Sequence, residues 1–243
     1  IGGHPVRALK ASGFKGGIYP VNPNRPDIQG LRAYPSIVSI DGPCDMAVIV
    51  VPAEEVPASI EACAQKGIRY AVVLTSGFGE AGEAGCARER ALARQARSLG
   101  IRMLGPNCQG VISVPSRVFA VFGSISEEVD IEAGSLSAVF QSGGFGFAAM
   151  NLAEQQGAGL RHMASTGNGA DVGILELLNA YLDDAGTHAA FGYLEGMGEG
   201  RGLVELGARS LRERKPVLVW KAARSEVGSR AARSHTGNLA GSY

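Results

Sequence analysis

The chain has 243 residues and balances 23 Lys and Arg against 23 Asp and Glu, so its formal net charge is zero. Its 45% hydrophobic and 19% charged residues are typical of a globular chain of one large or two small domains, and exclude a disordered one. The zero charge removes the electrostatic argument for a nucleic acid or an anionic membrane as partner, and no apolar run approaches the ~20 residues that cross a bilayer.

Short apolar runs alternate with longer Ala-, Leu-, Arg- and Glu-rich stretches along the first half. We predict strands at residues 17–21, 46–51, 70–74 and 101–104, and helices at about 4–12, 54–66 and 85–99. The strands are apolar almost throughout, which is typical of parallel strands covered on both faces, and their alternation with helices predicts right-handed βαβ units. Because the first helix needs a strand before it, we expect the parent protein to contain one upstream.

Gly, Ser and acidic residues interrupt this alternation over residues 119–134, so we predict a domain boundary near Ser124, with domains at 1–123 and 124–243. After the boundary the pattern restarts. We predict strands at 136–140, 160–164, 190–194 and 217–220, and helices at about 145–156, 172–181 and 203–214. The predicted fold class is therefore α/β, with two domains in tandem, each built on a parallel sheet.

A glycine-rich turn, Ser142-Gly143-Gly144, lies between an apolar predicted strand and a predicted helix. Unpaired N–H groups and the helix dipole favour an anion at such a helix start, and glycine lets the anion approach the backbone. The turn could therefore hold a phosphate or a carboxylate without a Lys or Arg. The same residues also suit an ordinary tight turn between strand and helix.

Small and polar residues follow four consecutive predicted strands of the first half, where open α/β sheets bind ligands. Together these loops favour a nucleotide-like ligand across one edge of the sheet, and Gly2-Gly3 before the first helix could cradle a phosphate in the same way. The candidate residues in these loops are Asn22, Pro23, Val51, Pro52, Thr75, Ser76, Gly77 and Asn107.

His235 lies in the small polar segment Ser234-His235-Thr236-Gly237, where an exposed imidazole would suit nucleophilic or proton-transfer work. Glu195 ends an apolar strand, and its carboxylate could accept the second ring N–H of an imidazole. A plain loop histidine and a solvated or helix-capping glutamate remain the alternatives. Asn168 and Asp171 are interpreted as turn residues.

The four cysteines form no CxxC pair, so neither a zinc site nor a disulfide framework is predicted, and reduced thiols favour a cytoplasmic protein.

Eight segments of the chain, taken in their order, resemble those of the NDP-forming acyl-CoA synthetases, relatives of the succinyl-CoA synthetase α subunit. The resemblance covers nearly the whole chain. It rests on the following segments: Tyr19-Pro20-Val21-Asn22-Pro23, Val51-Pro52-Ala53, Ser76-Gly77-Phe78, Gly105-Pro106-Asn107-Cys108-Gln109-Gly110, Gln141-Ser142-Gly143-Gly144, Gly167-Asn168 with Asp171, Glu195-Gly196 and Ser234-His235-Thr236-Gly237.

The resemblance implies a Rossmann-type CoA-binding domain followed by a flavodoxin-like ligase domain. It also implies the reaction acyl-CoA + NDP + phosphate ⇌ carboxylate + CoA + NTP, through an acyl phosphate and a phosphohistidine. By this resemblance His235 is the phosphorylated histidine, Glu195 steadies it, and Ser142-Gly143-Gly144 receives the phosphate. The loop residues named above, with Gly2 and Gly3, become the expected CoA contacts.

The chain departs from the family pattern in two places. Phe147 stands where the succinyl-CoA synthetase branch has a tyrosine, so an acid other than succinate is expected, with Phe145 and Phe147 lining its pocket. The chain stops at Tyr243 without an ATP-grasp motif, so we expect ATP or ADP with Mg to bind an ATP-grasp domain or β subunit elsewhere, in an oligomer.

Three alternatives remain open at this point. A CoA-sensing or regulatory module could keep the fold and lose turnover, and a protein acyltransferase could carry this chain as a fused part. A nicotinamide-dependent oxidoreductase would need an intact GxGxxG with an acidic residue about 20 positions later, and this combination is not found.

Overall fold

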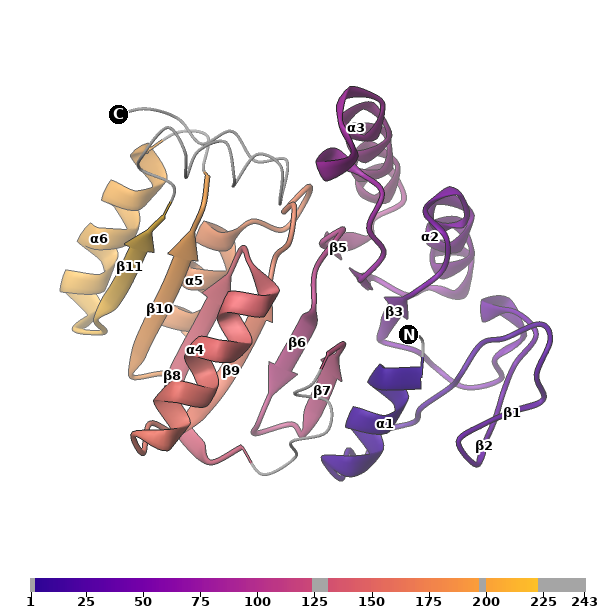
Figure 1. Ribbon diagram of the computed structural model, residues 1–243, viewed down its shortest axis with the longest axis horizontal. Coiled ribbons are helices and arrows are strands. Elements are labelled where there is room, and N and C mark those ends of the chain that lie inside the picture. The colour runs from indigo at the N-terminus through magenta and orange to yellow at the C-terminus, as the bar shows by residue number, and fades with distance from the viewer. Residues whose placement is uncertain (1–2, 124–130, 197–199, 223–243) are drawn as a thin grey trace.

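The computed structural model describes residues 3–123, 131–196 and 200–222, which form a three-stranded and a six-stranded sheet flanked by helices, and a small two-stranded sheet (Figure 1). The first sheet is parallel and has three strands in the order β3-β4-β5. The first part of the chain contains α1 (Gly3–Ala11), β1 (Asp27–Ile28), β2 (Leu31–Arg32), β3 (Met46–Ile49), α2 (Val56–Lys66), β4 (Tyr70–Val73), α3 (Glu83–Ser98) and β5 (Arg102–Leu104).

The second sheet has six strands in the order β11-β10-β8-β9-β6-β7. Strands β8 to β11 pair in parallel; α4 packs on β8 and β9, and α5 contacts β8 and β10 from behind in Figure 1. This part contains β6 (Gly110–Ser113), β7 (Val118–Val121), β8 (Ala133–Phe140), α4 (Gly143–Gln155), β9 (Leu160–Ser165), α5 (Ile174–Asp183), β10 (Ala189–Leu194), α6 (Arg201–Glu213) and β11 (Val217–Lys221). The predicted α/β class with parallel sheets is confirmed.

The strand predicted at residues 17–21 is wrong. This segment forms only an isolated bridge between Val21 and Tyr34, with hydrogen bonds from Asn22 N–H to Tyr34 O (2.9 Å) and from Tyr34 N–H to Pro20 O (2.8 Å). Pro20 has no N–H to donate, so the pairing does not continue into a ladder.

Strands β6 and β7 were not predicted. They form an antiparallel hairpin, and β6 also pairs antiparallel with β9, so the second sheet includes residues 110–121, which precede the predicted boundary. Helix α1 packs against β7 and is thereby fastened to the second sheet. The boundary near Ser124 stays a prediction.

The two sheets share one hydrophobic core. Val72, Leu74 and Leu104 from the first sheet and its loops pack in the same cluster as residues of the second sheet and of α5. Val139 and Ala164 belong to the second sheet, and Ile174 and Leu178 belong to α5. Burial of this shared apolar surface stabilises the contact between the two halves.

A segment after β9 runs along the end of β5 and fastens the halves with main-chain hydrogen bonds. The N–H groups of Asn168, Ala170 and Val172 donate to the carbonyls of Pro106, Gly105 and Met103, each at 3.0 Å. Gly167 has a φ of +54°, and a Cβ at this position would lie 2.2 Å from the carbonyl oxygen of Asn107. Only glycine fits here, because both the backbone conformation and the close approach exclude a side chain.

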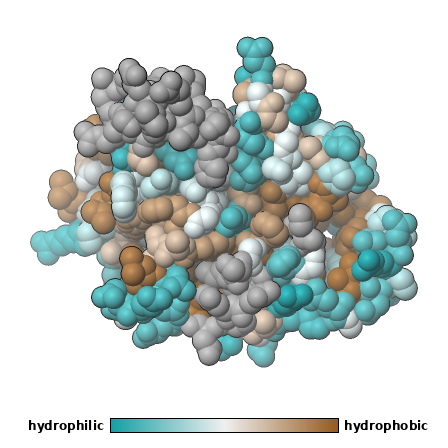
Figure 2. Space-filling model, in the orientation of Figure 1, coloured by the Kyte–Doolittle hydropathy of each residue, from teal (hydrophilic) through white to brown (hydrophobic). Residues whose placement is uncertain are grey.

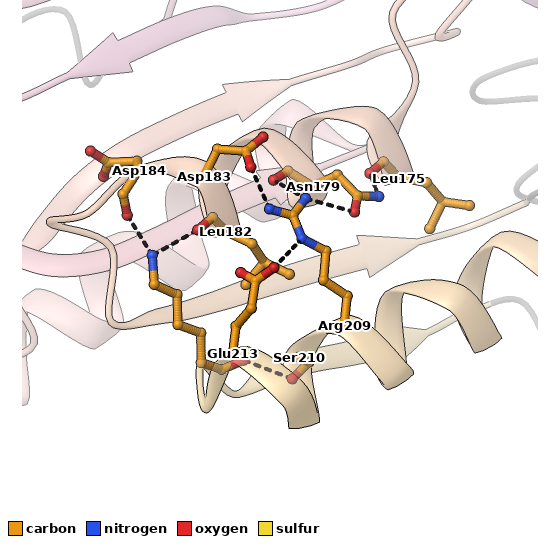
Figure 3. A network of polar contacts seen from close by, with 9 residues as sticks. Leu175, Asn179, Leu182, Asp183, Asp184, Arg209, Ser210 and Glu213 are labelled. Atoms are coloured by element: carbon orange, nitrogen blue, oxygen red, sulfur yellow. Dashed lines mark hydrogen bonds and ion pairs between the residues drawn. The ribbon is translucent and has the colours of Figure 1, made fainter.

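Polar contacts hold α6 against α5 at the far side of the second sheet (Figure 3). The Arg209 guanidinium donates to Glu213 Oε1 (2.7 Å), Asn179 O (3.0 Å) and Asn179 Oδ1 (3.1 Å), and also pairs with Asp183. Lys215 Nζ donates to the carbonyls of Leu182 and Asp184 at 2.7 Å each, and so holds the last turn of α5. These contacts join α5 to α6 and to the segment that follows α6.

The four cysteines are free, and no cluster of His, Cys, Asp and Glu that could hold a metal ion lies within the described ranges. None of the helices in these ranges combines the length and the apolar character needed to span a bilayer.

Candidate functional site

A cavity of about 530 Å³ opens where the carboxyl ends of β3, β4, β5 and β8 meet. Both sheets therefore contribute to it, as expected for ligand sites of open α/β sheets. Among the predicted site residues, Val51, Pro52, Thr75, Ser76, Asn107, Gly143 and Gly144 line the cavity. It is also lined by residues that sequence reasoning did not single out: Val50, Leu74, Glu80, Cys108, Gln109, Phe122 and Gln141.

The other predicted residues that the structure describes do not line this cavity. Gly3 begins α1, and the Asn22 carboxamide accepts a hydrogen bond from the Asn24 N–H (2.9 Å) in the loop before Pro23. Ser142, Phe145, Phe147 and Glu195 lie in or next to α4 and β10, and Gly77 follows β4. Gly2 and His235 lie outside the described residues, so their roles stay predictions.

The start of α4 presents main-chain N–H groups to the cavity. Ser142 is the N-cap, and its hydroxyl accepts from the Phe145 N–H at 3.5 Å. The N–H groups of the first helical residues, Gly143 and Gly144, have no acceptor within the helix. A Cβ on Gly144 would meet nothing within 4 Å, so the backbone is open to a ligand there. Dipole and geometry together suit an anion.

The loop after β4 is organised by a carboxylate of its own. Glu80 Oε1 accepts from the N–H groups of Gly77 (2.5 Å) and Phe78 (3.2 Å), and the Thr75 hydroxyl donates to Val51 O at 2.7 Å. These two N–H groups already have an anionic acceptor. The loop is therefore less suited to a phosphate than the start of α4, although sequence alone made the two alike.

Asn168 joins this loop to the second half of the chain. Its Nδ2 donates to Glu80 Oε2 and to Glu89 Oε2, both at 2.6 Å, and its Oδ1 accepts from Asn107 Nδ2 at 3.1 Å. Burial raises the pKa of Glu80, but hydrogen bonds from Asn168 and the loop N–H groups outweigh it, so the pKa lies below its ordinary value. Asn168 is thus more than the turn residue that sequence suggested.

Glu195 is buried at the end of β10, and the Gln141 side chain fixes its backbone. Gln141 Oε1 accepts from the N–H groups of Glu195 (2.5 Å) and Gly196 (3.0 Å), and Nε2 donates to Gly196 O (2.7 Å). Lys221 Nζ donates to Glu195 O at 2.8 Å. In the sequence Gln141 stood out only as the first residue of the segment Gln141-Ser142-Gly143-Gly144, without a role of its own.

Phe145 belongs to an aromatic cluster on the α4 face of the second sheet. Its ring stacks on Tyr193, with centroids 4.0 Å apart, and meets Trp220 edge-on at 5.4 Å. Apolar residues gather over α4, β10 and β11 on this face (Figure 2), where Trp220 is 55% exposed. Phe147 packs against the core under α4. Whether either ring contacts an acyl group stays a prediction.

Two family models account for nearly the whole chain in the order expected from the residues. Residues 2–113 match a CoA binding domain, and residues 133–243 match a succinyl-CoA ligase-like flavodoxin domain. The chain belongs to the NDP-forming acyl-CoA synthetases. The resemblance seen in its sequence is thereby confirmed, together with the pairing of a CoA-binding and a flavodoxin-like unit.

The relatives of this chain are named as ADP-forming acyl-CoA ligases. It is 42% identical to the α subunit of an ADP-forming acetate–CoA ligase I of Pyrococcus furiosus, matching all of this chain and 52% of that subunit. It is 34% identical to an ADP-forming 4-hydroxybutyrate–CoA ligase of Nitrosopumilus maritimus, over 95% of this chain and 33% of the relative. The chain thus spans a third to a half of these relatives.

Solved structures agree with this assignment. The acetyl-coenzyme A synthetase 1 of Candidatus Korarchaeum cryptofilum, in complex with phosphate and ADP, superposes with a TM-score of 0.88 at 40% identity, over 98% of this chain and 50% of that one. A Pyrococcus horikoshii protein superposes at 0.84 and 32% identity, over 97% and 52%.

Proposed function

We propose that this chain is the CoA-binding and phosphoryl-carrying part of an NDP-forming acyl-CoA ligase, which catalyses acyl-CoA + NDP + phosphate ⇌ carboxylate + CoA + NTP. The observation that supports this best is that two kinds of surface line the same cavity. One wall consists of loops at the carboxyl edge of the CoA-binding sheet, and the other is the open, glycine-lined start of α4.

CoA would bind along the first wall. Val51, Pro52, Thr75, Ser76 and Asn107 place apolar and polar groups side by side in the cavity, as an arm with alternating methylene and amide groups requires. Asn22, Pro23, Gly77 and the glycines Gly2 and Gly3 before α1 would contact the rest of the molecule.

Phosphate would bind at the start of α4, on the N–H groups of Gly143 and Gly144 with Ser142 as cap. In the direction of acyl-CoA cleavage, a phosphate oxygen attacks the thioester carbonyl carbon, the C–S bond breaks, and the CoA thiolate leaves and takes up a proton. The acyl phosphate that remains would be held by the helix dipole. Fixed dipoles stabilise the developing negative charge without a mobile cation.

His235 would then receive the phosphoryl group. A ring nitrogen attacks phosphorus, the P–O bond to the acyl group breaks, and the carboxylate leaves. Glu195 would accept the N–H of the other ring nitrogen and stabilise the cation that forms. The buried Glu195 main chain, fixed by Gln141 and Lys221, gives this carboxylate a defined position.

The remaining partners belong to the same proposal. An ATP-grasp module, fused or on a β subunit, would take the phosphoryl group from His235 onto ADP with Mg, in an oligomeric enzyme. Phe145 and Phe147 would shape the acyl pocket. The domains would be 1–123 and 124–243, and the free thiols fit a reducing cytoplasm.

Labelling of the complete protein, with its ATP-grasp module, tests this function. Incubation with γ-³²P-ATP should give an acid-labile label on the wild type. The His235→Asn variant should lose both this label and acyl-CoA formation. His188→Asn is the matched control, because His188 is exposed and lies just before β10, at the end of that strand opposite Glu195. Full acyl-CoA synthesis by His235→Asn, or CoA binding by a wild type that forms no thioester, would contradict the proposal.

A further inference from the structure

Gln109 brings a buried polar atom without a partner into the cavity. The residue lines the cavity directly before β6, and the main-chain Phe122 N–H donates to its carbonyl at 3.0 Å. Its side-chain Oε1 is fully screened from solvent and accepts no hydrogen bond within the described part of the chain. A buried carboxamide oxygen left in this state costs about 1–3 kcal/mol, so a ligand that donates to it would gain from the contact.

The side chain lies against the start of α4. A Cβ on Gly143 would come within 2.5 Å of Gln109 Cγ and 2.7 Å of Cδ, and a Cβ on Gly123 would lie 3.8 Å from Oε1. Glycine at position 143 therefore leaves room for the carboxamide itself. The side chain thus lies between the helix start proposed to hold phosphate and the segment that follows β7.

The chemistry of the proposed ligands selects a partner for this oxygen. A carboxylate and an acyl phosphate dianion offer only acceptors at neutral pH, and inorganic phosphate has at most a proton or two on oxygens that the helix start already attracts. CoA differs from all of these, because its reactive arm carries amide N–H groups up to a few bonds from the sulfur. A carboxamide oxygen is the natural acceptor for an amide N–H.

We propose that the Gln109 carboxamide turns toward bound CoA, so that its Oε1 accepts a hydrogen bond from the CoA amide N–H nearest the thiol and directs the sulfur toward the start of α4. This inference rests on the function proposed above and adds a specific binding residue to it. The contact would fix the arm a few bonds before the reacting atom, where a small error in direction has a large effect on the rate.

The first test compares Gln109→Met with the wild type in the complete protein. Methionine keeps the length of the side chain but removes the acceptor, so kcat/KM for CoA in thioester synthesis should fall about 3- to 10-fold. Phosphorylation of the protein by NTP needs no CoA and should keep its wild-type rate. Gln155→Met is the control, because Gln155 is an exposed residue at the end of α4.

The second test identifies the bond through the ligand. In a CoA analogue with oxygen in place of the amide nitrogen nearest the thiol, the wild type should lose the same 3- to 10-fold. Gln109→Met should lose nothing further, because the two changes remove one bond. Calorimetry of CoA and of the analogue binding to both proteins makes the same comparison of protein change and ligand change without turnover.

Additive losses, a Gln109→Met enzyme equal to Gln155→Met, or slower phosphorylation by NTP would overturn the assignment of Gln109. A melting temperature equal to that of the wild type shows that Gln109→Met is folded. The calorimetric binding constants then compare two folded proteins. A wild type that binds CoA but forms no acyl-CoA would instead contradict the proposed function. The failure of each is therefore distinguishable.

Discussion

Asn168 shows how one amide can hold three parts of the chain. Its two N–H donors each take a different carboxylate, Glu80 and Glu89, while its oxygen accepts from Asn107. The hydrogen bonds keep the pKa of Glu80 below its ordinary value of 4.5 despite burial. Because that pKa is lowered, the stabilisation is complete above pH 4.5 and is lost as the pH falls through the folded-state value.

Asn168→Asp should therefore be more damaging than Asn168→Ala at neutral pH. The alanine variant loses the hydrogen bonds, whereas the aspartate variant also places a third carboxylate beside Glu80 and Glu89, for a further loss of roughly 1–3 kcal/mol. Protonation of these clustered carboxylates should relieve their repulsion as the pH falls. Urea unfolding of both variants at pH 7 and pH 5 measures this, and a gap that does not narrow at pH 5 would contradict it.

Gly144 allows the folding and binding roles of the α4 start to be separated. Its position is open, so Gly144→Ala should keep the fold, with stability unchanged or raised by up to ~1 kcal/mol from helix propensity. The new methyl group would stand where an anion approaches the backbone, so KM for phosphate should rise. Steady-state kinetics and thermal unfolding of this one variant measure both effects. An unchanged KM would place phosphate elsewhere.

At the level of elements, most helices and strands could be predicted because their apolar residues follow a regular period. The structure places strands β3, β4, β8 and β10 within a few residues of their expected positions. The β6–β7 hairpin could not be predicted in the same way. Val111 and Ile112 form only a short run, and their partner β9 lies about 50 residues away, beyond any local pattern.

The segment after β9 is fastened to the first half by an ion pair at Asp171, whose side chain is 2% exposed. Its carboxylate pairs with Arg97 Nε (2.6 Å) and Arg102 Nε (3.1 Å), and accepts from the Met103 N–H at 2.8 Å. Burial raises the pKa of Asp171, but the hydrogen bonds from these donors lower it by more than burial raises it. The pKa therefore lies below its ordinary value of 3.8. Its stabilisation is therefore present at neutral pH.

Asp171→Asn should lower the free energy of unfolding by about 2 kcal/mol at pH 7, because one acceptor becomes a donor that faces two guanidinium groups. The difference from wild type should shrink as the pH falls below 3.8, where Asp171 of the unfolded chain takes up a proton before Asp171 of the folded protein does. Asp41→Asn is the control, since its partner Arg32 lies 3.9 Å away and Asp41 is 81% exposed; it should cost less than ~0.5 kcal/mol. Equal losses in the two variants would contradict the assignment.

At the scale of the whole molecule, the sequence was sufficient to place the strand ends and their polar loops on one edge. It was not sufficient to say which side chains meet. Gln141 supports Glu195 across 54 positions, and Asn168 reaches Glu80 across 88. Such contacts depend on the docking of two sheets, and no local period encodes that docking. The resemblance to a family supplied the order of the motifs, Gln141 and Asn168 among them, but not the contacts of these two side chains.

The shared core predicts that the two halves unfold together. Leu104 is 6% exposed, and it packs with Val139 and Leu178 of the second half as well as with Val72 of its own sheet. Leu104→Ala should cost about 2–5 kcal/mol. Hydrogen exchange should show equal losses of protection at the amides of Val72 in β4 and Val139 in β8, because both exchange only through opening of one cooperative unit. Leu152→Ala, at a residue that is 60% exposed on α4, should change neither amide by more than ~0.5 kcal/mol. A loss confined to Val72 would mean that the first sheet opens by itself while the second stays folded.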